Sequence, residues 1–169
     1  MSMMEFVEIG KIHSEFKTLN NMPIQPTGEK SLEGKIVINE EYAEGLKDLE
    51  EFSHLIVIYF FHEVRKHKLI VKPFMDDKKR GVFSTRAPVR PNPIGLSVLE
   101  IEKIEGNIIY IKNIDVLDQT PVLDIKPVVP DFDFPKGEIR VGWLENRSKG
   151  VKEKESDHRF VQKKSKLNE

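Results

Sequence analysis

The residues with the clearest chemical potential stand in a proline-rich stretch, 81–95, which carries Arg86, Arg90 and Asn92. Its three prolines are Pro88, Pro91 and Pro93. Proline fixes its own φ and restricts the residue before it, so we expect neither a helix nor a central strand here. A stiffened loop loses little entropy when its guanidinium groups grip an anionic or planar ligand. A rigid turn with solvated arginines suits the pattern equally well.

A second polar group lies at 118–121, Asp-Gln-Thr-Pro. This pattern predicts a turn, because Asp bonds the backbone ahead of it and proline stops regular structure. In the functional interpretation, Asp118 and Thr120 present a carboxylate and a hydroxyl at the rim of a barrel. Asp124 and Lys126 stand two residues apart, which places them on one face of a strand. Structural roles are the simpler interpretation of both groups when the residues are taken by themselves.

Other catalytic and metal motifs are missing from the sequence. It has no cysteine, which excludes disulfides, thiolate metal sites and cysteine nucleophiles. It has neither a glycine-rich dinucleotide loop nor a phosphate-binding P-loop. His62 and His67 are five residues apart, so they do not share one helical face as zinc-protease histidines do. We therefore expect no bound metal.

The net charge of the 169-residue chain is −1, which does not by itself indicate a nucleic-acid-binding protein. Charge is concentrated locally, because residues 65–90 hold nine Lys and Arg against two Asp, a net charge of +7. Such a patch binds phosphates by counterion release, although a solvated loop has the same composition. No apolar run approaches the roughly 18 residues that span a bilayer. Residues 1–6 lack the features of a signal peptide, so we expect a cytoplasmic protein without membrane attachment.

Short, turn-separated strands and one short helix predict a mainly β protein. We expect a single compact antiparallel β-barrel domain over residues 5–145 and a charged tail over 146–169. The strands are expected at 6–12, 34–39, 52–61, 94–104, 108–116, 122–125 and 138–143. Asn39 is expected to cap a helix over 40–49, and the apolar run 52–61 is expected to be buried on both faces. A basic connector is expected over 64–79.

Two segments together resemble one family. Residues 83–95 (FSTRAPVRPNPIG) and 117–127 (LDQTPVLDIKP) are similar to those of the TsaA-like family, also called TrmO-type tRNA methyltransferases. Supporting matches lie at 9–14, 22–26, 52–55 and 60–62. The resemblance implies a compact β-barrel that binds S-adenosylmethionine without a Rossmann domain, and a homodimer with cofactor sites near the subunit boundary. It also implies methylation of the exocyclic N6 amine of a threonylcarbamoyl-modified adenosine next to a tRNA anticodon.

The resemblance further implies the positions of the cofactor contacts. They fall on Pro23, Ile24, Gln25, His62, Glu63, Arg86, Leu96, Asp118, Gln119, Thr120 and Pro121. Three of them depart from the family pattern, because Ile24 stands for an arginine, Glu63 for a glutamine and Gln119 for a glycine. Losing the arginine removes a contact to a carboxylate or phosphate, and Glu63 adds a charge that suits a cation. Gln119 requires a turn that tolerates a side chain.

Methyl transfer from a sulfonium requires the amine, the methyl group and the sulfur to be held in line, with water excluded. The amine must also lose a proton, and Asp118, Asp124 or a water molecule remain open as the acceptor. The expected substrate-binding residues are Arg90, Asn92 and Lys126. Arg90 can stack on a flipped-out base while residues 65–80 hold phosphates, although Arg90 and Asn92 can equally brace the loop. The three departures motivate an alternative, a non-catalytic S-adenosylmethionine- or RNA-binding module.

Overall fold

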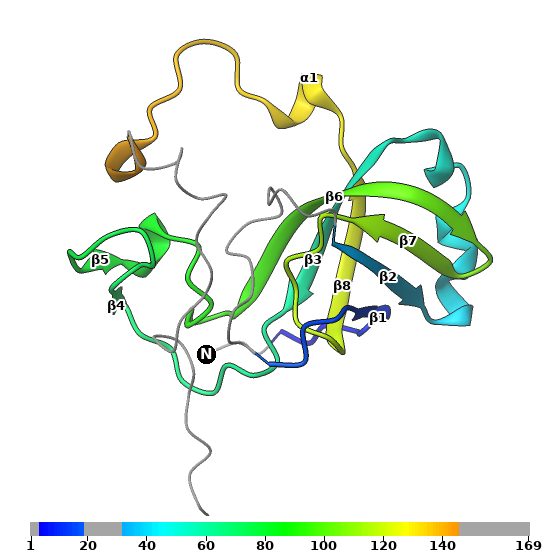
Figure 1. Cartoon of the computed structure of the whole chain (residues 1–169), viewed down its shortest axis with the longest axis horizontal. Helices are drawn as coiled ribbons and strands as arrows, with labels where there is room; N and C mark the ends of the chain where they lie inside the picture. The colour runs from blue at the N-terminus through cyan, green and yellow to red at the C-terminus, as the bar shows by residue number, and fades with distance from the viewer. Residues whose placement is uncertain (1–3, 19–31, 146–169) are drawn as a thin grey trace, which may run out of the picture.

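The computed structural model describes residues 4–18 and 32–145, and its centre is a closed antiparallel β-barrel (Figure 1). Around the barrel the strands follow the order β1, β2, β7, β6, β3 and β8. Their bounds are β1 Gly10–His13, β2 Glu33–Ile38, β3 His54–Phe60, β6 Ile94–Glu105, β7 Ile108–Lys112 and β8 Thr120–Pro127. The expected fold class, a mainly β protein built on one antiparallel barrel, is confirmed.

The barrel has two different ends, because every pair of neighbouring strands is antiparallel. At one end, called the site end below, β1, β3 and β7 finish and β2, β6 and β8 begin. The segments that adjoin these strand ends gather there, namely 14–18, 61–63, 92–93 and 113–119. The proline-rich stretch and the Asp-Gln-Thr-Pro turn, far apart in the sequence, are thus carried to the same end of the barrel.

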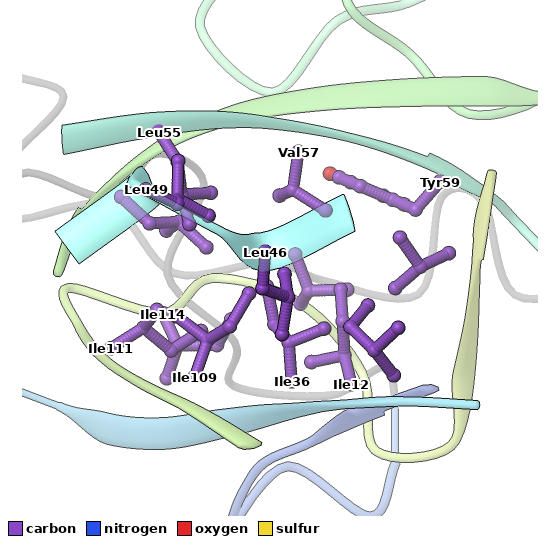
Figure 2. Packing of buried hydrophobic residues seen from close by; sticks show 14 residues of the cluster. Ile12, Ile36, Leu46, Leu49, Leu55, Val57, Tyr59, Ile109, Ile111 and Ile114 are labelled. Atoms are coloured by element: carbon purple, nitrogen blue, oxygen red, sulfur yellow. The ribbon is translucent and has the colours of Figure 1, made fainter. Parts of the chain in front are cut away.

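Branched apolar side chains fill the barrel, since inward-facing positions alternate along each strand. At the end opposite the site end, the chain between β2 and β3 forms two 3-10 segments, η1 Glu40–Leu46 and η2 Leu49–Glu51. Leu46 and Leu49 of these segments belong to the core and close that end with apolar groups. Figure 2 shows Leu49 at one side of the cluster and Tyr59, with its hydroxyl oxygen, at the other.

Two expected strands are shorter in the structure. The strand expected over 6–12 begins only at Gly10, and the side chain of Phe6 is 63% exposed, so it has no core to enter. The strand expected over 108–116 ends at Lys112, because the next residue, Asn113, has a φ of 62°. A residue in the left-handed region turns the chain out of an extended strand.

The helix expected over 40–49 is wrong. The two 3-10 segments that replace it are separated at Asp48, whose φ of 66° places it in the left-handed region, where helices end. Asn39 does not cap the segment with its side chain. Its Nδ2 instead donates to the carbonyl oxygen of Glu8 at 3.0 Å, which ties the segment to the chain just before β1.

The apolar run 52–61 forms β3, but the expected burial on both faces is wrong. Buried residues alternate with partly exposed ones along the strand. The inward set includes Leu55 and Val57, whereas Ile56 and Ile58 point to the outside of the barrel. A barrel keeps one face of every strand toward solvent, which produces this alternation in burial. The outward positions of this strand are also apolar, so the sequence shows a continuous apolar run instead.

The strand expected over 138–143 is also wrong. This part of the chain is irregular and ends in the 3-10 segment η4 Gly142–Leu144. Since β8 already pairs with β1, the closed barrel offers no edge to a further strand. Gly137 and Gly142 have φ values of 97° and 58°, which an extended strand does not accommodate.

The expected basic connector contains regular structure. Within residues 64–79 it holds the short strand β4 Ile70–Val71, which pairs with β5 Arg80–Gly81 just beyond the expected bounds. The 3-10 segment η3 Val82–Ser84 follows β5, and this small sheet lies to one side of the barrel (Figure 1). A short helix, α1 Pro130–Asp133, follows β8. Within residues 4–18 and 32–145, no helix has the length and apolar character needed to cross a membrane.

Candidate functional site at one end of the barrel

A connected polar network lies toward the site end of the barrel. Tyr59 of β3 and Ser97 of β6 face inward, and their hydroxyl oxygens are 3.2 Å apart. The Ser97 hydroxyl donates to Asp115 Oδ1 at 2.8 Å, which leaves the Tyr59 hydroxyl to donate to Ser97. Tyr59 is 5% and Ser97 is 2% exposed, and Asp115 is partly buried. These polar groups are therefore satisfied by one another in a barrel whose core is mainly apolar.

The surroundings of Asp115 oppose its ionisation. Burial raises the pKa of Asp115 from 3.8 to about 6, although the Ser97 hydrogen bond and the charge of Arg86 act in the opposite direction. Burial, and after it the charge of Asp115, also raises the pKa of Tyr59. Arg86 is close enough to lower the pKa of both groups. A carboxyl group that titrates near neutral pH is well suited to accept and release protons.

Gly95 makes room for the Tyr59 ring. A Cβ atom at Gly95 would lie 2.9 Å from Cζ of Phe61 and closer still to two atoms of the Tyr59 ring. The rings of Tyr59 and Phe61 meet edge to face, with centroids 5.3 Å apart and planes at 81°. The glycine that ends the Pro-Asn-Pro-Ile-Gly motif therefore positions the aromatic residue of the polar network.

Asp118 connects two loops at the site end. Its Oδ1 accepts the backbone N–H of Ser14 at 3.0 Å, and its Oδ2 lies 2.6 Å from Nζ of Lys17. Gln119 Nε2 donates to Asp118 Oδ2 at 3.3 Å and lies 3.1 Å from His13 Nδ1. Burial opposes ionisation of Asp118, but the hydrogen bonds from Lys17 and Ser14 outweigh it and lower the pKa of Asp118. This carboxylate is charged and held by donors of its own chain.

The backbone of Gln119 explains why the family pattern has a glycine at this position. Its φ is 64°, in the left-handed region that glycine enters without strain. In this chain a residue with a side chain adopts this conformation, so the turn tolerates a side chain, as expected for Gln119. The Gln119 side chain contributes its contacts to His13 and Asp118.

The side chains of His62, just after β3, and Thr120, in β8, come together at the site end. His62 follows β3, and its Nδ1 lies 3.4 Å from Oγ1 of Thr120, the first residue of β8. Thr120 is 2% exposed. Glu63 Oε1 lies 4.0 Å from His62 Nε2. The structure thus brings these three expected cofactor contacts to the site end, where Asp118 and Gln119 also lie.

The two expected substrate residues of the proline-rich stretch differ in their surroundings. Arg90 Nη1 donates to the carbonyl oxygens of Val82 at 3.1 Å and Thr85 at 2.8 Å, and more weakly to that of Ala87 at 3.4 Å. This guanidinium therefore braces the loop. Asn92 is exposed at the turn before β6.

Four further expected site residues lie on the outer face of the barrel. Leu96 is 48% exposed and pairs with Ile58 of β3, which pairs with Asp124 on its other side. Asp124 Oδ2 lies 2.7 Å from Lys126 Nζ, so the prediction that the two share a face is confirmed. Pro121 pairs with Lys11 of β1 at the start of β8. The remaining expected contacts, Pro23, Ile24 and Gln25, lie outside the described residues.

The polar network itself was not predicted from the sequence. Ser97 and Tyr59 are hydroxyl residues at inward positions of otherwise apolar strands, and Asp115 lies between the buried Ile114 and Val116. A lone polar residue in a buried register is the signal that identifies such a group, but it becomes visible only when the strand register is known. Among the described residues, no set of three or more His, Cys, Asp or Glu converges as a metal site, and the expectation of no metal remains a prediction.

The fold and the site define a class of protein, a small closed β-barrel that carries a partly buried acid and an arginine at one end. Residues 11–134 match the family described as the tRNA-methyltransferase O N-terminal domain. The match covers well over half of the chain, and the chain belongs to this family. The resemblance stated from the sequence is therefore confirmed.

Individual relatives agree with the family match. A probable S-adenosyl-L-methionine-binding protein of Pyrococcus abyssi is 49% identical over 152 residues, which cover 90% of this chain and 82% of the relative. The tRNA (adenine(37)-N6)-methyltransferase of Mus musculus is 38% identical over 137 residues, which cover 76% of this chain but 31% of the mouse protein. The crystal structure of TrmO from Pseudomonas aeruginosa is 34% identical, with a TM-score of 0.70 over 84% of this chain and 63% of that chain.

Proposed function

We propose that the chain is an S-adenosylmethionine-dependent tRNA methyltransferase with its active centre at the site end of the barrel. The main support is that Arg86 acts electrostatically on Asp115 and Tyr59, at the barrel end that also holds His62 and Asp118. The names of the Pyrococcus and mouse relatives support the methyl donor and the tRNA substrate. The finer proposal is that the acceptor is the N6 amine of a threonylcarbamoyl-modified adenosine next to the anticodon.

The chemistry of the residues at the site end fits S-adenosylmethionine. Arg86 offers a guanidinium to a carboxylate, Glu63 and Asp118 offer negative charge near cationic groups, and Thr120 offers a hydroxyl. When bound, the cofactor supplies a methyl group activated by a positively charged sulfur. The proposed contacts remain Pro23, Ile24, Gln25, His62, Glu63, Arg86, Leu96, Asp118, Gln119, Thr120 and Pro121.

The three aspartates of this region differ in what their carboxylates already contact. Asp118 is held by Lys17, and Asp124 pairs with Lys126 on the outer face of the barrel. Asp115 accepts a hydrogen bond from an uncharged hydroxyl and has a pKa of about 6. We therefore assign the proton transfer to Asp115 in preference to the two aspartates expected from the sequence. As N6 gains the methyl group, its N–H bond breaks and the proton passes to the Asp115 carboxylate.

The tRNA is proposed to approach the site end from the side that carries the basic residues 65–90, and Arg90, Asn92 and Lys126 remain proposed substrate contacts. A homodimer and a cytoplasmic location, both expected from the sequence, remain predictions. So do the domain bounds of 5–145 and 146–169.

The proposal is tested with tRNA that carries or lacks the threonylcarbamoyl group, using mass spectrometry of the digested nucleosides. Wild-type protein should methylate the modified adenosine alone, and equal methylation of unmodified adenosine would contradict the finer proposal. Arg86→Ala should abolish methyl transfer without loss of folding. Lys103→Ala is the matched control, because Lys103 pairs with Glu105 at the opposite end of the barrel. Wild-type turnover by Arg86→Ala would refute its assignment.

Arg86 can also be tested without measuring activity. Its charge lowers the pKa of Asp115, so Arg86→Ala should raise that pKa above the wild-type value, whereas Arg86→Lys should largely retain it. An NMR titration of the Asp115 carboxyl carbon measures both. An unchanged pKa in Arg86→Ala would show that the two groups do not interact.

A non-catalytic S-adenosylmethionine-binding module is the second candidate. The departures at Glu63 and Gln119 and the name of the Pyrococcus relative, which mentions binding alone, favour it. Calorimetry and the methylation assay together separate the two candidates, because both would bind S-adenosylmethionine whereas the module would leave every tRNA unmethylated.

A further inference from the structure

Residues 64–90 form an appendage beside the barrel with a small core of its own. Val71 of β4, Val82 of η3 and two residues of the proline-rich stretch, Ala87 and Val89, are at most 7% exposed and pack together. Val64 packs against this cluster at its edge. A separate apolar core means that the surface of this appendage is presented in a fixed shape, even though its regular elements are only two or three residues long.

The turn at residues 82–84 is also held by polar contacts. Besides the hydrogen bond that Arg90 donates to Val82, Trp143 of η4 donates its indole N–H to the carbonyl oxygen of Ser84 at 2.8 Å. Arg80 lies over the Trp143 ring, 5.5 Å from its centroid, and pairs with the buried carboxylate of Asp76 at 2.6 Å. The turn 82–84 is thus fixed by residues before it and after it in the chain.

This fixed turn presents an exposed aromatic side chain. Phe83 is 74% exposed, and the guanidinium of Arg90 lies over its ring, 5.8 Å from the centroid. Leu69 and Ile70, at and beside β4, are each 58% exposed. The backbone N–H of Val82 bonds the carbonyl oxygen of Leu69 at 2.8 Å, so these side chains belong to adjoining segments. A folded protein gains nothing in its own stability from an aromatic ring left in water.

The charge around Phe83 selects the kind of partner. Residues 65–90 carry a net charge of +7, and both acids of the segment are occupied within it, Asp76 by Arg80 and Asp77 by Lys72. Lys68 and Lys79 are exposed. The appendage therefore combines cations with an exposed, rigidly held ring. Single-stranded RNA matches both features, because its phosphates pair with lysines and its unstacked bases stack on aromatic rings.

We propose that Phe83 is a stacking platform for an unpaired base of an RNA loop, and that the lysines of the appendage hold the flanking phosphates. This inference rests on the proposed function in one respect, since it takes the RNA to be the anticodon loop of the substrate tRNA. It adds the surface by which the loop is held, outside the polar network where the chemistry is proposed. An acidic peptide would use the charges without the ring, and an anionic membrane would need a larger apolar surface.

The test is a comparison of two phenylalanines. Phe83→Leu keeps an apolar side chain but removes the aromatic face, and Phe132→Leu is its control, because Phe132 in α1 is 84% exposed and lies outside the appendage. With unmodified and modified tRNA, Phe83→Leu should weaken binding roughly tenfold, and Phe132→Leu should leave it unchanged. Lys79→Ala should reduce the slope of log affinity against log salt concentration by about one. Trp143 is the only tryptophan of the chain, and its fluorescence reports binding at the appendage directly.

The outcomes separate this inference from the proposed function. If wild-type protein methylates tRNA but Phe83→Leu binds it as tightly as wild type, the platform is refuted and the function stands. If no tRNA is methylated but binding depends on Phe83, the function fails and the platform stands. Equal affinity of wild-type protein for a polyglutamate peptide, or for vesicles of phosphatidylserine, would also overturn the assignment to RNA.

Discussion

Asp115→Asn should make the protein more stable at neutral pH while it abolishes methyl transfer. The pKa of Asp115 is raised by folding, so the folded protein binds this proton more tightly than the unfolded chain does. The contribution of Asp115 to wild-type stability is therefore largest below its ordinary pKa of 3.8 and is lost as the pH rises toward about 6. Since one pKa unit corresponds to about 1.4 kcal/mol, the loss amounts to about 3 kcal/mol above pH 6.

Asparagine removes this loss because it does not ionise, and its Oδ1 can still accept the hydrogen bond from Ser97. The stability difference between variant and wild type should be close to zero in acid and should grow to about 3 kcal/mol in favour of the variant at neutral pH. Denaturant unfolding from about pH 3.5 to about pH 8, followed by Trp143 fluorescence, measures this difference. The other acids titrate in both proteins, so their contributions cancel.

A stability difference that does not change with pH would refute the account of Asp115. So would a variant that is less stable than wild type at every pH, because the carboxylate would then contribute favourable contacts that outweigh its burial. Methyl transfer is measured on the same samples. A stable, tRNA-binding variant without activity is the expected combination, and it separates a catalytic role from a structural one.

Three further substitutions probe the supports of the site. Gly95→Ala should cost roughly 1–3 kcal/mol in the free energy of unfolding, because the added methyl group displaces the Tyr59 ring, and thermal unfolding measures it. Gln119→Gly should be about 1 kcal/mol more stable than Gln119→Ala, because both lose the side chain and glycine alone accepts the φ of 64° without strain; equal stabilities would contradict this. Asp118→Asn should lose about 1 kcal/mol at neutral pH through its pairing with Lys17. Because the pKa of Asp118 is lowered by folding, this deficit should disappear as the pH falls through the folded-state pKa, and denaturant unfolding across the acid range checks the sign.

The barrel was predictable because its strands and turns depend mainly on residues that are near one another in the sequence. Alternation over 94–104 and a turn at Gly106, whose φ is 60°, mark the hairpin of β6 and β7, and both strands formed. The failures lie where tertiary context decides. An acidic, Ala- and Leu-containing segment such as 40–49 has a helical pattern, but its position across one barrel end favoured two short 3-10 segments. The segment 138–143 has strand-like residues and no edge to join.

Individual site residues were predictable from the sequence, but the contacts between them were not. Arg86 and the 118–121 turn were identified by residue type and by resemblance, and the strand order explains why they lie at one end. Ser97 and Asp115 were not predicted because a serine in a strand and an aspartate near a strand end are common. Only the register of β3 with β6 shows that Ser97 and Tyr59 both point into the barrel, where their hydroxyl groups meet. Asp124 was a natural candidate in the sequence, but the irregular pairing of β3 with β8 at Ile58 leaves it on the outer face.

The different environments of the aspartates bear on which one takes part in the chemistry. Asp118 is stabilised by its donors and has a lowered pKa, so its charge supports the fold. Asp115 is held where its charge opposes folding, and a carboxyl group kept under such a penalty at the end of an apolar barrel is expected to serve the reaction. If it accepts the N6 proton, the rate of methyl transfer should rise with pH through about pH 6, as the carboxylate forms. The same rise should persist in Asp118→Asn at a lower rate, since that residue positions loops, and a profile that is unchanged in a residually active Asp115→Asn would assign the proton to another acceptor.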